Sequence, residues 1–503
     1  MYSFVHLSLI TVIAFLIVPQ IDRARRRQAS LPPGPKGLPI LGNIRDVANR
    51  RDLLWVTYSQ WAERFGEVFH LKVFNDHTIV LNSHEAITEL LEKRSQNYSD
   101  RPDMPMLVEL IGGGWQIAFM RYSDSWRLHR KTFHQAFQGP SLPDYYDVQR
   151  GAVSNLVEKL ATAPEAFVDH INHFAGFIIL KIIYGYTLKT KDDAYLEMVN
   201  KALGGIVPAM NHGSFWVDYL PILKYIPGES VLHLLNITSL TFAQAWVPGA
   251  QFKRNAAVWY SYCEDLKEKP WDWVKHGEAT GIADSSFCTQ TAERLGVTIG
   301  EGSEMEDMLK NCAFSAYTAG ADTTDGTLLS FVLAMTLHPE VQARAQKEIE
   351  RVVGPGSLPD FDSRDSLPYV NALIAEVLRW RPVTPLSLPH RAVNEDVYAG
   401  YRIPAGATIV GNVWAVMNDE TLYGPDVASF NPDRFMKTDG ENPPHPEQYA
   451  FGFGRRVCPG KNFAMNSLYL AISNILARYT IMKPLDENGN EYSPKVEYTD
   501  NGT

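Results

Sequence analysis

The sequence predicts a mainly helical protein with a small β region. From about Glu304 to Leu337 the chain has no proline and few charges, which indicates a helix that runs through the core. The clearest strand signal is Val68 to Asn82, which predicts a strand pair around Asn75-Asp76. Helical spacing of apolar residues recurs in the ranges 55–65, 85–94, 147–184 and 463–479. Helices therefore dominate the predicted fold.

Composition limits the function classes. The chain has 503 residues and is 45% hydrophobic, which allows a large core and, by length alone, about three domains. The motifs described below are spread over most of the chain and must converge on one site, so we expect one catalytic domain. A net charge of -10 without a basic tract argues against a nucleic-acid binder. The cysteines are too few and too scattered for a disulfide framework, which predicts a reducing compartment; they are Cys263, Cys288, Cys312 and Cys458.

Residues 1–21 are predicted to form an N-terminal membrane anchor. The run from Phe4 to Val18 is almost wholly apolar and has neither the leading positive charge nor the small-residue cleavage site of a secretory signal. Arginines follow the run at once, which places the rest of the chain on the cytosolic side. A helix lying on the membrane surface is the alternative, because polar residues dilute the run.

Residues 22–39 are predicted to be a basic, proline-rich linker, and residues 40–503 the catalytic domain. The prolines between Leu31 and Gly37 favour an extended chain. We expect an irregular, mobile loop from Asp100 to Trp115, because it holds two prolines and three consecutive glycines. The range 267–298 is polar and is expected to be irregular surface.

A glycine-rich basic turn around Cys458 is the strongest candidate for chemistry. A free thiol titrates near pH ~8.5, and nearby positive charge or backbone N–H groups lower that value. Arg455 and Arg456 are expected to supply the charge. One thiolate cannot complete a zinc or iron–sulfur site, which needs about three or four protein ligands, whereas a haem iron needs only one. On these residues alone, a buried inert cysteine beside surface arginines is the open alternative.

The stretch from Phe451 to Gly460 resembles the haem-binding signature of cytochromes P450, Phe-x-x-Gly-x-Arg-x-Cys-x-Gly, with every fixed position filled. The resemblance implies the cytochrome P450 fold and a haem b cofactor whose iron takes the Cys458 thiolate as axial ligand. It also places Phe451 in the cofactor site and gives Arg456 a haem propionate to bind.

Trp126 and Arg130 form a second motif. They are four residues apart, so they share one face of a helix that Ser123 or Asp124 is suited to cap. An indole N–H and a guanidinium together make a good anion clamp. The pair resembles the family's Trp-x-x-x-Arg, which binds a haem propionate; a basic surface helix with a half-buried tryptophan is the alternative.

The middle of the long predicted helix breaks local rules. Gly320 in a helix interior costs about 1 kcal/mol against alanine, and a buried Asp322 carboxylate costs more unless it is paired. The segment resembles the family's Ala/Gly-Gly-x-Asp/Glu-Thr-Thr. By that resemblance Gly320 leaves room for dioxygen, Thr323 donates a hydrogen bond to oxygen at the iron, and Asp322 helps to bring in protons. A kinked helix with satisfied polar groups is the alternative. Asp325 has no assigned role.

Two more segments resemble family motifs. Glu376 and Arg379 match the family's Glu-x-x-Arg, which joins a downstream arginine, here Arg434, in a buried network. The range 382–391 is too proline-rich for helix and must run extended. In relatives this segment passes the substrate pocket, and the position of His390 holds a propionate.

The resemblance implies a microsomal, fungal-type P450 monooxygenase that converts R–H and dioxygen to R–OH and water. Electrons would come from NADPH through a reductase that carries FAD and FMN, with cytochrome b5 as a second donor, at the endoplasmic reticulum membrane. The implied substrate is a hydrophobic molecule of secondary metabolism, such as a terpenoid or an aromatic intermediate. A basic face suited to an acidic reductase is expected from Arg121, Arg127, Arg130, Lys131, Arg455 and Lys461.

Two other classes remain open at this point. A haem-thiolate isomerase or dehydratase would need no reductase. A non-catalytic haem protein that only binds a ligand would not need the pair Asp322 and Thr323. Relatives also commonly continue with another strand beyond the position of Thr503, so the resemblance implies a C-terminal truncation.

Overall fold

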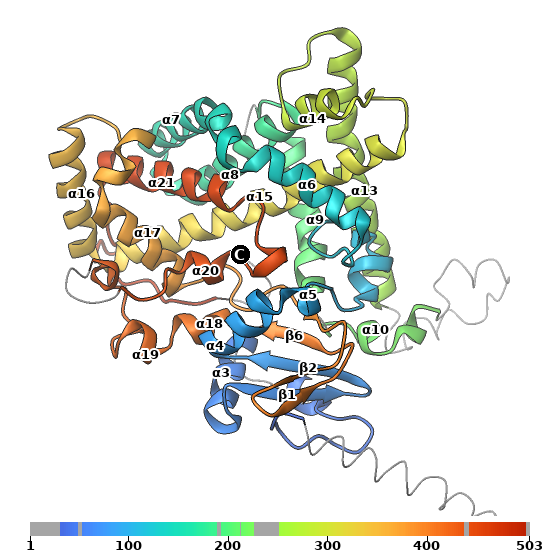
Figure 1. Cartoon of the computed structure of the whole chain (residues 1–503). Coiled ribbons are helices and arrows are strands. Elements are labelled where there is room, and N and C mark those ends of the chain that lie inside the picture. Colours follow the sequence, from blue (N-terminus) through green and yellow to red (C-terminus); the bar gives the residue numbers. More distant parts are fainter. Residues whose placement is uncertain are drawn as a thin grey trace, which may run out of the picture.

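A computed structural model describes residues 31–48, 53–188, 193–211, 213–225, 251–436 and 442–498. The predicted anchor, residues 1–21, lies outside the described residues. A large helical body lies beside a small β region, which is drawn at the bottom of Figure 1. This arrangement confirms the predicted mainly helical fold.

The helices carry most of the chain. The α-helices are α2 (Ile44–Ala48), α3 (Leu54–Phe65), α4 (His84–Ile87), α5 (Ser95–Tyr98), α6 (Asp124–Phe137), α7 (Tyr146–Thr162), α8 (Phe167–Tyr184), α9 (Ala194–Met210), α10 (Trp216–Tyr219), α13 (Gln251–Thr280), α14 (Phe287–Leu295), α15 (Glu304–Leu337), α16 (Pro339–Val353), α17 (Pro368–Trp380), α18 (Val413–Met417), α19 (Glu420–Tyr423), α20 (Glu447–Ala450) and α21 (Lys461–Arg478). Short π-helical or 3₁₀ turns are η1 (Thr88–Lys93), η2 (Met106–Leu110), η3 (Gly113–Trp115), η4 (Gly139–Tyr145), η5 (Pro164–Ala166), η6 (Pro221–Tyr225), η8 (Phe361–Ser366), η9 (Pro432–Phe435) and η10 (Gly454–Arg456).

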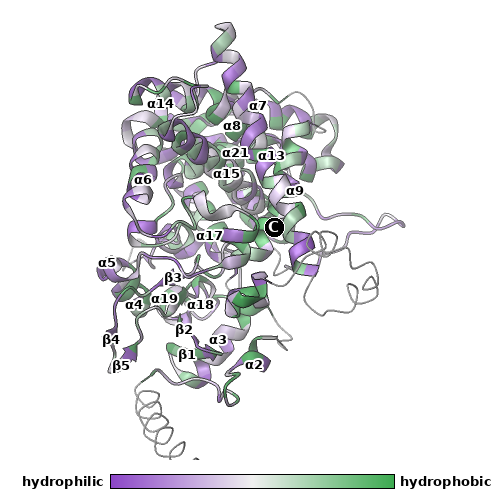
Figure 2. Cartoon of the chain, turned by 90° about the vertical axis from the view of Figure 1, so that its right-hand side faces the viewer, coloured by the Kyte–Doolittle hydropathy of each residue, from purple (hydrophilic) through white to green (hydrophobic). Residues whose placement is uncertain are grey.

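The long helix predicted from the sequence is α15, and its bounds are those expected. The Ser303 side chain caps it by accepting a hydrogen bond from the Glu306 backbone N–H at 3.2 Å. The helix contacts α8, α9, α13, α14, α17 and α21, so it runs through the core of the helical body. Outer helices such as α6 and α14 carry hydrophilic residues next to hydrophobic ones (Figure 2), as expected for helices with one buried face.

The small sheet has the strand order β1-β2-β6-β3, with β1 (Val68–Val73), β2 (Asp76–Leu81), β3 (His390–Arg391) and β6 (Thr408–Gly411). A two-stranded ribbon of β4 (Asp396–Tyr398) and β5 (Tyr401–Ile403) stands apart. The antiparallel pair β1 and β2 confirms the predicted hairpin. The proline-rich segment runs extended along it, because the His70 N–H donates to the Pro33 carbonyl at 2.8 Å.

Two sequence-based expectations about irregular segments are wrong. The range 267–298 is largely helical, since it contains the end of α13 and all of α14. Its polar residues lie on the outer face, while Leu266, Trp271 and Val274 face the core at helical spacing. The range 100–115 also contains regular turns, η2 and η3. In both segments burial of one face outweighs weak local propensity.

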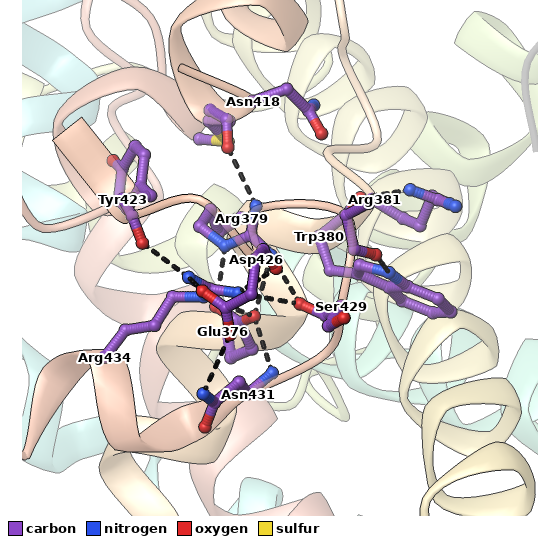
Figure 3. Close-up of polar contacts among 12 residues, drawn as sticks. Glu376, Arg379, Trp380, Arg381, Asn418, Tyr423, Asp426, Ser429, Asn431 and Arg434 are labelled. Atoms are coloured by element: carbon purple, nitrogen blue, oxygen red, sulfur yellow. Dashed lines mark hydrogen bonds and ion pairs between the residues drawn. The ribbon is translucent and has the colours of Figure 1, made fainter. Parts of the chain in front are cut away.

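A buried ion network joins α17 to the chain before the cysteine turn (Figure 3), and it confirms the predicted link to Arg434. The Glu376 carboxylate accepts from Arg379 Nε and Nη2, each at 2.7 Å, and from Arg434 Nε at 3.2 Å. It also accepts from the Asn431 backbone N–H at 2.8 Å. Asp433 lies outside this network and pairs with Arg344 of α16.

Among the described residues one helical stretch, Pro164–Tyr184, is long and apolar enough to cross a membrane. Its most apolar window is 56% buried inside the fold. Because it packs against α15, we interpret it as a core helix.

Candidate active site

The cysteine turn is held by its own backbone and by the neighbouring element η1. The Cys458 N–H donates to the Phe451 carbonyl at 2.7 Å, which closes the turn. Gly454 has φ +52°, and a β-carbon there would lie 2.3 Å from the Leu91 carbonyl oxygen. Only glycine allows this close approach to η1. The Gly454 N–H donates to Glu92 Oε1 at 2.9 Å, so the turn is fixed before α21 begins.

The charges around the thiol differ from those expected. Burial raises the pKa of Cys458, while the Gly460 N–H and the positive charges of Arg130 and Lys461 lower it. Arg455 turns away and donates to the Tyr122 hydroxyl at 2.7 Å. The sequence-based assignment of Arg455 and Arg456 as the charges beside the thiol is therefore wrong, because the turn points both guanidinium groups toward other partners.

Arg456 lies beside the predicted clamp on α6. Its guanidinium carbon stands 4.3 Å from the centre of the Trp126 ring. Its guanidinium N–H groups donate hydrogen bonds to the backbone carbonyls of residues 99, 117 and 120. Trp126 is buried, and its indole N–H has no hydrogen-bond partner among the described residues. Arg130, four residues on, donates to the Val457 carbonyl at 2.5 Å, so α6 is tied to the cysteine turn.

Arg101 and His390 complete this buried group, in which the two arginines are the cations and burial keeps His390 neutral by lowering its pKa. Arg101 is 4% exposed and donates to the carbonyls of Ala118, Leu388 and Pro389. His390 is 3% exposed and bonds through Nδ1 to the Tyr98 carbonyl at 2.6 Å. Sequence reasoning missed Arg101, because a lone arginine before a proline carries no spacing signal.

This cationic group fits a ligand that carries carboxylates. Burial lowers the pKa of Arg456 to about 8 and that of Arg101 to about 10, and the charge of Arg101 adds to the effect on Arg456. Burial, followed by the charge of Arg101, holds the pKa of His390 well below its ordinary value. No ion pair joins these three side chains to an acid within the described part of the chain. Buried charges are costly without a partner, and haem b presents two carboxylates of the required sign.

The middle of α15 presents two exposed residues, Ala319 and Thr323, one turn apart among residues that are buried or half-buried. The Thr323 hydroxyl donates to the Ala319 carbonyl at 2.9 Å. Asp322 is half-buried. A β-carbon on Gly320 would lie 2.7 Å from Ile179 Cδ1 of α8, so a larger residue here would have to displace the end of that side chain. Its place beside dioxygen stays a prediction.

A cavity of about 210 Å³ lies between α9, α15, the sheet and the extended segment after α17. The whole range 382–389 lines it, together with Gly326 and Ser330 of α15. Tyr498 also lines the cavity, and its hydroxyl lies 3.2 Å from the Ser330 hydroxyl. The segment expected to pass the substrate pocket thus forms a cavity wall.

The predicted basic face is present, but acids neutralise part of it. Arg127 and Arg455 both stand over the Tyr122 ring, at 5.5 and 5.6 Å from its centre. Ion pairs join Arg121 to Asp100 and Asp103, Arg127 to Asp124, and Lys461 to Glu447. The face is therefore less positive than a count of its basic residues suggests.

Comparison with known proteins gives one family. The family model for cytochrome P450 matches residues 32–242 and 290–496. A cytochrome P450 monooxygenase of Armillaria gallica is 39% identical over 97% of this chain and 92% of its own length. A second one, from Coprinopsis cinerea, is 37% identical over 97% of this chain and 89% of its own length. Tryptamine 4-monooxygenase of Psilocybe cyanescens is 34% identical over 95% of this chain and 91% of its own length. The chain belongs to the cytochrome P450 family, which implies a haem-thiolate cofactor, and it is a P450 monooxygenase.

Proposed function

We propose that this monooxygenase inserts one oxygen atom of dioxygen into a neutral, hydrophobic small molecule of fungal secondary metabolism, such as a terpenoid or an aromatic intermediate. The observation that carries the proposal is the combination of a single cysteine in a fixed turn with a buried group of cations beside it. A thiolate and carboxylate-binding donors in one place suit haem b and no simple metal ion.

The chain's own residues would hold the cofactor from two sides. Cys458 Sγ would bind the iron, with Phe451 beside it. The propionates would be held by Trp126, Arg130, His390 and Arg456, and by the newly found Arg101. When bound, the haem supplies the reductive activation of dioxygen and the transfer of one oxygen atom to the substrate.

Thr323 and Asp322 would transfer the protons that the reaction consumes. The Thr323 hydroxyl is exposed on the face of α15 and is held in place by the Ala319 carbonyl. Such a hydroxyl has free lone pairs, so it can accept a hydrogen bond while it donates its own hydrogen to the Ala319 carbonyl. Asp322, next in the chain and half-buried, would pass protons to it by way of water.

The cavity supports the substrate class. Its lining includes Leu71, Val73, Val410 and the proline-rich wall, and it includes no carboxylate among the described residues. A site without a carboxylate favours a neutral ligand over a protonated amine, because a buried cation needs a counter-charge. The Psilocybe relative is named for tryptamine, so relatives of this kind include an enzyme of an aromatic substrate.

Electrons would come from NADPH through a P450 reductase that carries FAD and FMN, with cytochrome b5 as a second donor. The clustered arginines around Tyr122 support docking of an acidic partner. Residues 1–21 would anchor the protein in the endoplasmic reticulum membrane, with the catalytic domain in the cytosol.

The proposal is tested by co-expressing the protein with a P450 reductase in yeast and profiling metabolites under ¹⁸O-labelled dioxygen. We expect a new product that contains one labelled oxygen and forms only when the reductase is present. Rearrangement or dehydration of a hydroperoxide substrate itself, without NADPH or reductase and without oxygen transfer to a second molecule, would instead identify an isomerase or dehydratase.

Thr323→Ala is expected to keep the haem but to lose coupling. Removal of Oγ1 disturbs proton delivery, so peroxide per NADPH rises several-fold while product falls by a similar factor. The measurement compares NADPH consumed, peroxide released and product formed. Thr327→Ala is the matched control, since its hydroxyl makes the same bond one turn back, to the Thr323 carbonyl, in a buried position. Unchanged coupling in Thr323→Ala would remove its assigned role.

Arg101→Met is expected to lower haem occupancy. The variant removes a buried cation that would face a propionate, so purified protein should hold at least several-fold less haem at equal fold content. Haem per polypeptide and circular dichroism measure the two quantities. Arg127→Met is the control, because Arg127 is exposed and pairs with Asp124. Equal haem occupancy in both variants would show that Arg101 serves only the carbonyls it contacts.

A further inference from the structure

Asp325 is a half-buried acid on α15 with incomplete hydrogen bonding. Its Oδ2 accepts from Asn172 Nδ2 of α8 at 3.4 Å, which is a long bond. Its Oδ1 is buried and has no partner among the described residues. No ion pair to Asp325 occurs within the described part of the chain. Burial, followed by the charge of Asp322, raises the pKa of Asp325 to about 6 against the lowering effect of Asn172.

Asp325 and Asp322 are three residues apart, so they are neighbours on one face of α15. Asp325 brings that face to α8 through its contact with Asn172, and earlier on α15 Gly320 lies against Ile179 of the same helix. The two helices run antiparallel here, because the earlier residue of α15 meets the later residue of α8. Asn172 is half-buried, so this seam also reaches toward solvent.

The other titratable groups of this part of α8 serve different partners. His173 is influenced by Lys159, His170 and Asp193, and His170 bonds to the Ala163 carbonyl at 2.9 Å. Asp169 is exposed. The only groups that shift the pKa of Asp325 besides burial are Asn172 and Asp322. No neighbouring cation in that set stabilises its carboxylate, so more of Asp325 is protonated near pH 6 to 7 than of an ordinary aspartate, and it can both take up and release a proton in that range.

We propose that Asp325 is a positioning residue that acts through Asp322: a carboxyl in the seam between α15 and α8 that takes up a proton and supplies it to Asp322, which passes it toward Thr323. In this step the Asp325 carboxyl proton moves to the Asp322 carboxylate, directly or through one water. Asp325 then takes a replacement proton from solvent beside Asn172, so protons balance and no oxidant is needed. The proposal rests on the proposed function of Asp322 and Thr323.

The first test measures the protonation of Asp325 without any activity. In the unfolded chain an aspartate titrates near ~3.9. Between about pH 4 and about pH 6 the folded protein therefore binds one more proton than the unfolded chain does. The free energy of unfolding falls as pH rises through that window. Asp325→Asn lacks this penalty. Its melting temperature relative to wild type should rise between about pH 4 and about pH 7 and then stay level. A difference that does not change with pH would overturn the proposal.

The second test measures proton supply in the haem-loaded protein with reductase and no added substrate. Asp325→Asn should slow NADPH consumption roughly ten-fold near neutral pH and raise the fraction recovered as peroxide. Its pH profile should lack the inflection that we expect for wild type near pH 6, and Asp325→Glu should restore it. Asp307→Asn is the control, because Asp307 lies on the same helix, is exposed and pairs with Lys310.

The outcomes separate the two levels of inference. Wild-type rates and pH profile in Asp325→Asn would show that the residue only links two helices, and would overturn the proposal while leaving the monooxygenase intact. Failure of wild type itself to consume NADPH with reductase would instead overturn the proposed function, and with it the role of Asp325 in proton supply.

Discussion

Replacing Cys458 by serine is expected to abolish monooxygenase activity and the absorbance band near ~450 nm that thiolate-ligated haem shows when reduced under carbon monoxide. A serine hydroxyl keeps the size of the side chain but is a far weaker electron donor than a thiolate. The turn itself should survive, because its closing bond from the residue 458 N–H to the Phe451 carbonyl is a backbone bond. We therefore expect the variant to lose thiolate ligation of the haem iron and its activity, but to fold as wild type does.

The other cysteines provide matched controls for this prediction. Cys263, Cys288 and Cys312 are each at most 1% exposed, and all three lie in helices of the helical body. Burial raises the pKa of each of their thiols, so none is poised as a thiolate. In a serine variant at any of these positions, the fraction of the protein that folds should keep the absorbance band. A thiolate spectrum that persists in Cys458→Ser and disappears in one of the other variants would refute the ligand assignment.

The elements that could be predicted are those in which one local signal is strong. The apolar, proline-free run gave the bounds of α15, and the alternating residues around Asn75-Asp76 gave the hairpin of β1 and β2. The link from Glu376 to Arg434 could also be predicted, because the motif fixes both ends of the network. In each case the sequence pattern and the tertiary contacts favour the same structure.

The parts that could not be predicted depend on tertiary contacts alone. α13 continues through Pro270, because burial of Trp271 and its neighbours outweighs the cost of the proline and the polar outer face. The Arg455 guanidinium turns to Tyr122 because of how the cysteine turn lies on α6. Arg101 enters the site only through folding of the loop that carries it, since its three acceptors lie in two distant segments. No spacing rule joins these residues.

The buried network of Glu376 supplies the prediction with the largest effect on folding. Glu376→Gln keeps the shape of the side chain but removes the negative charge at the centre of two guanidinium groups. Arg379 is 0% and Arg434 4% exposed, so neither can recover hydration. Breaking a buried ion pair on one side costs about 3–5 kcal/mol, which is a large part of the ~5–15 kcal/mol that holds a typical domain together. Asp426 stays beside Arg434 at 2.7 Å, but it is half exposed and leaves Arg379 without a carboxylate.

We therefore expect Glu376→Gln to accumulate as unfolded or aggregated protein that binds no haem, measured by soluble yield, circular dichroism and haem content at reduced growth temperature. Glu340→Gln on the adjacent α16 is the control, because its carboxylate is exposed and pairs only with His338. An exposed pair of this kind contributes about 0–1 kcal/mol, so the control should fold as wild type does. Normal yield and haem content in Glu376→Gln would show that carbonyls of residues such as Met417 and Ser429, which accept from Arg379 at 2.8 and 3.2 Å, are enough to hold the buried charges. The network would then orient the chain before the cysteine turn without stabilising the fold.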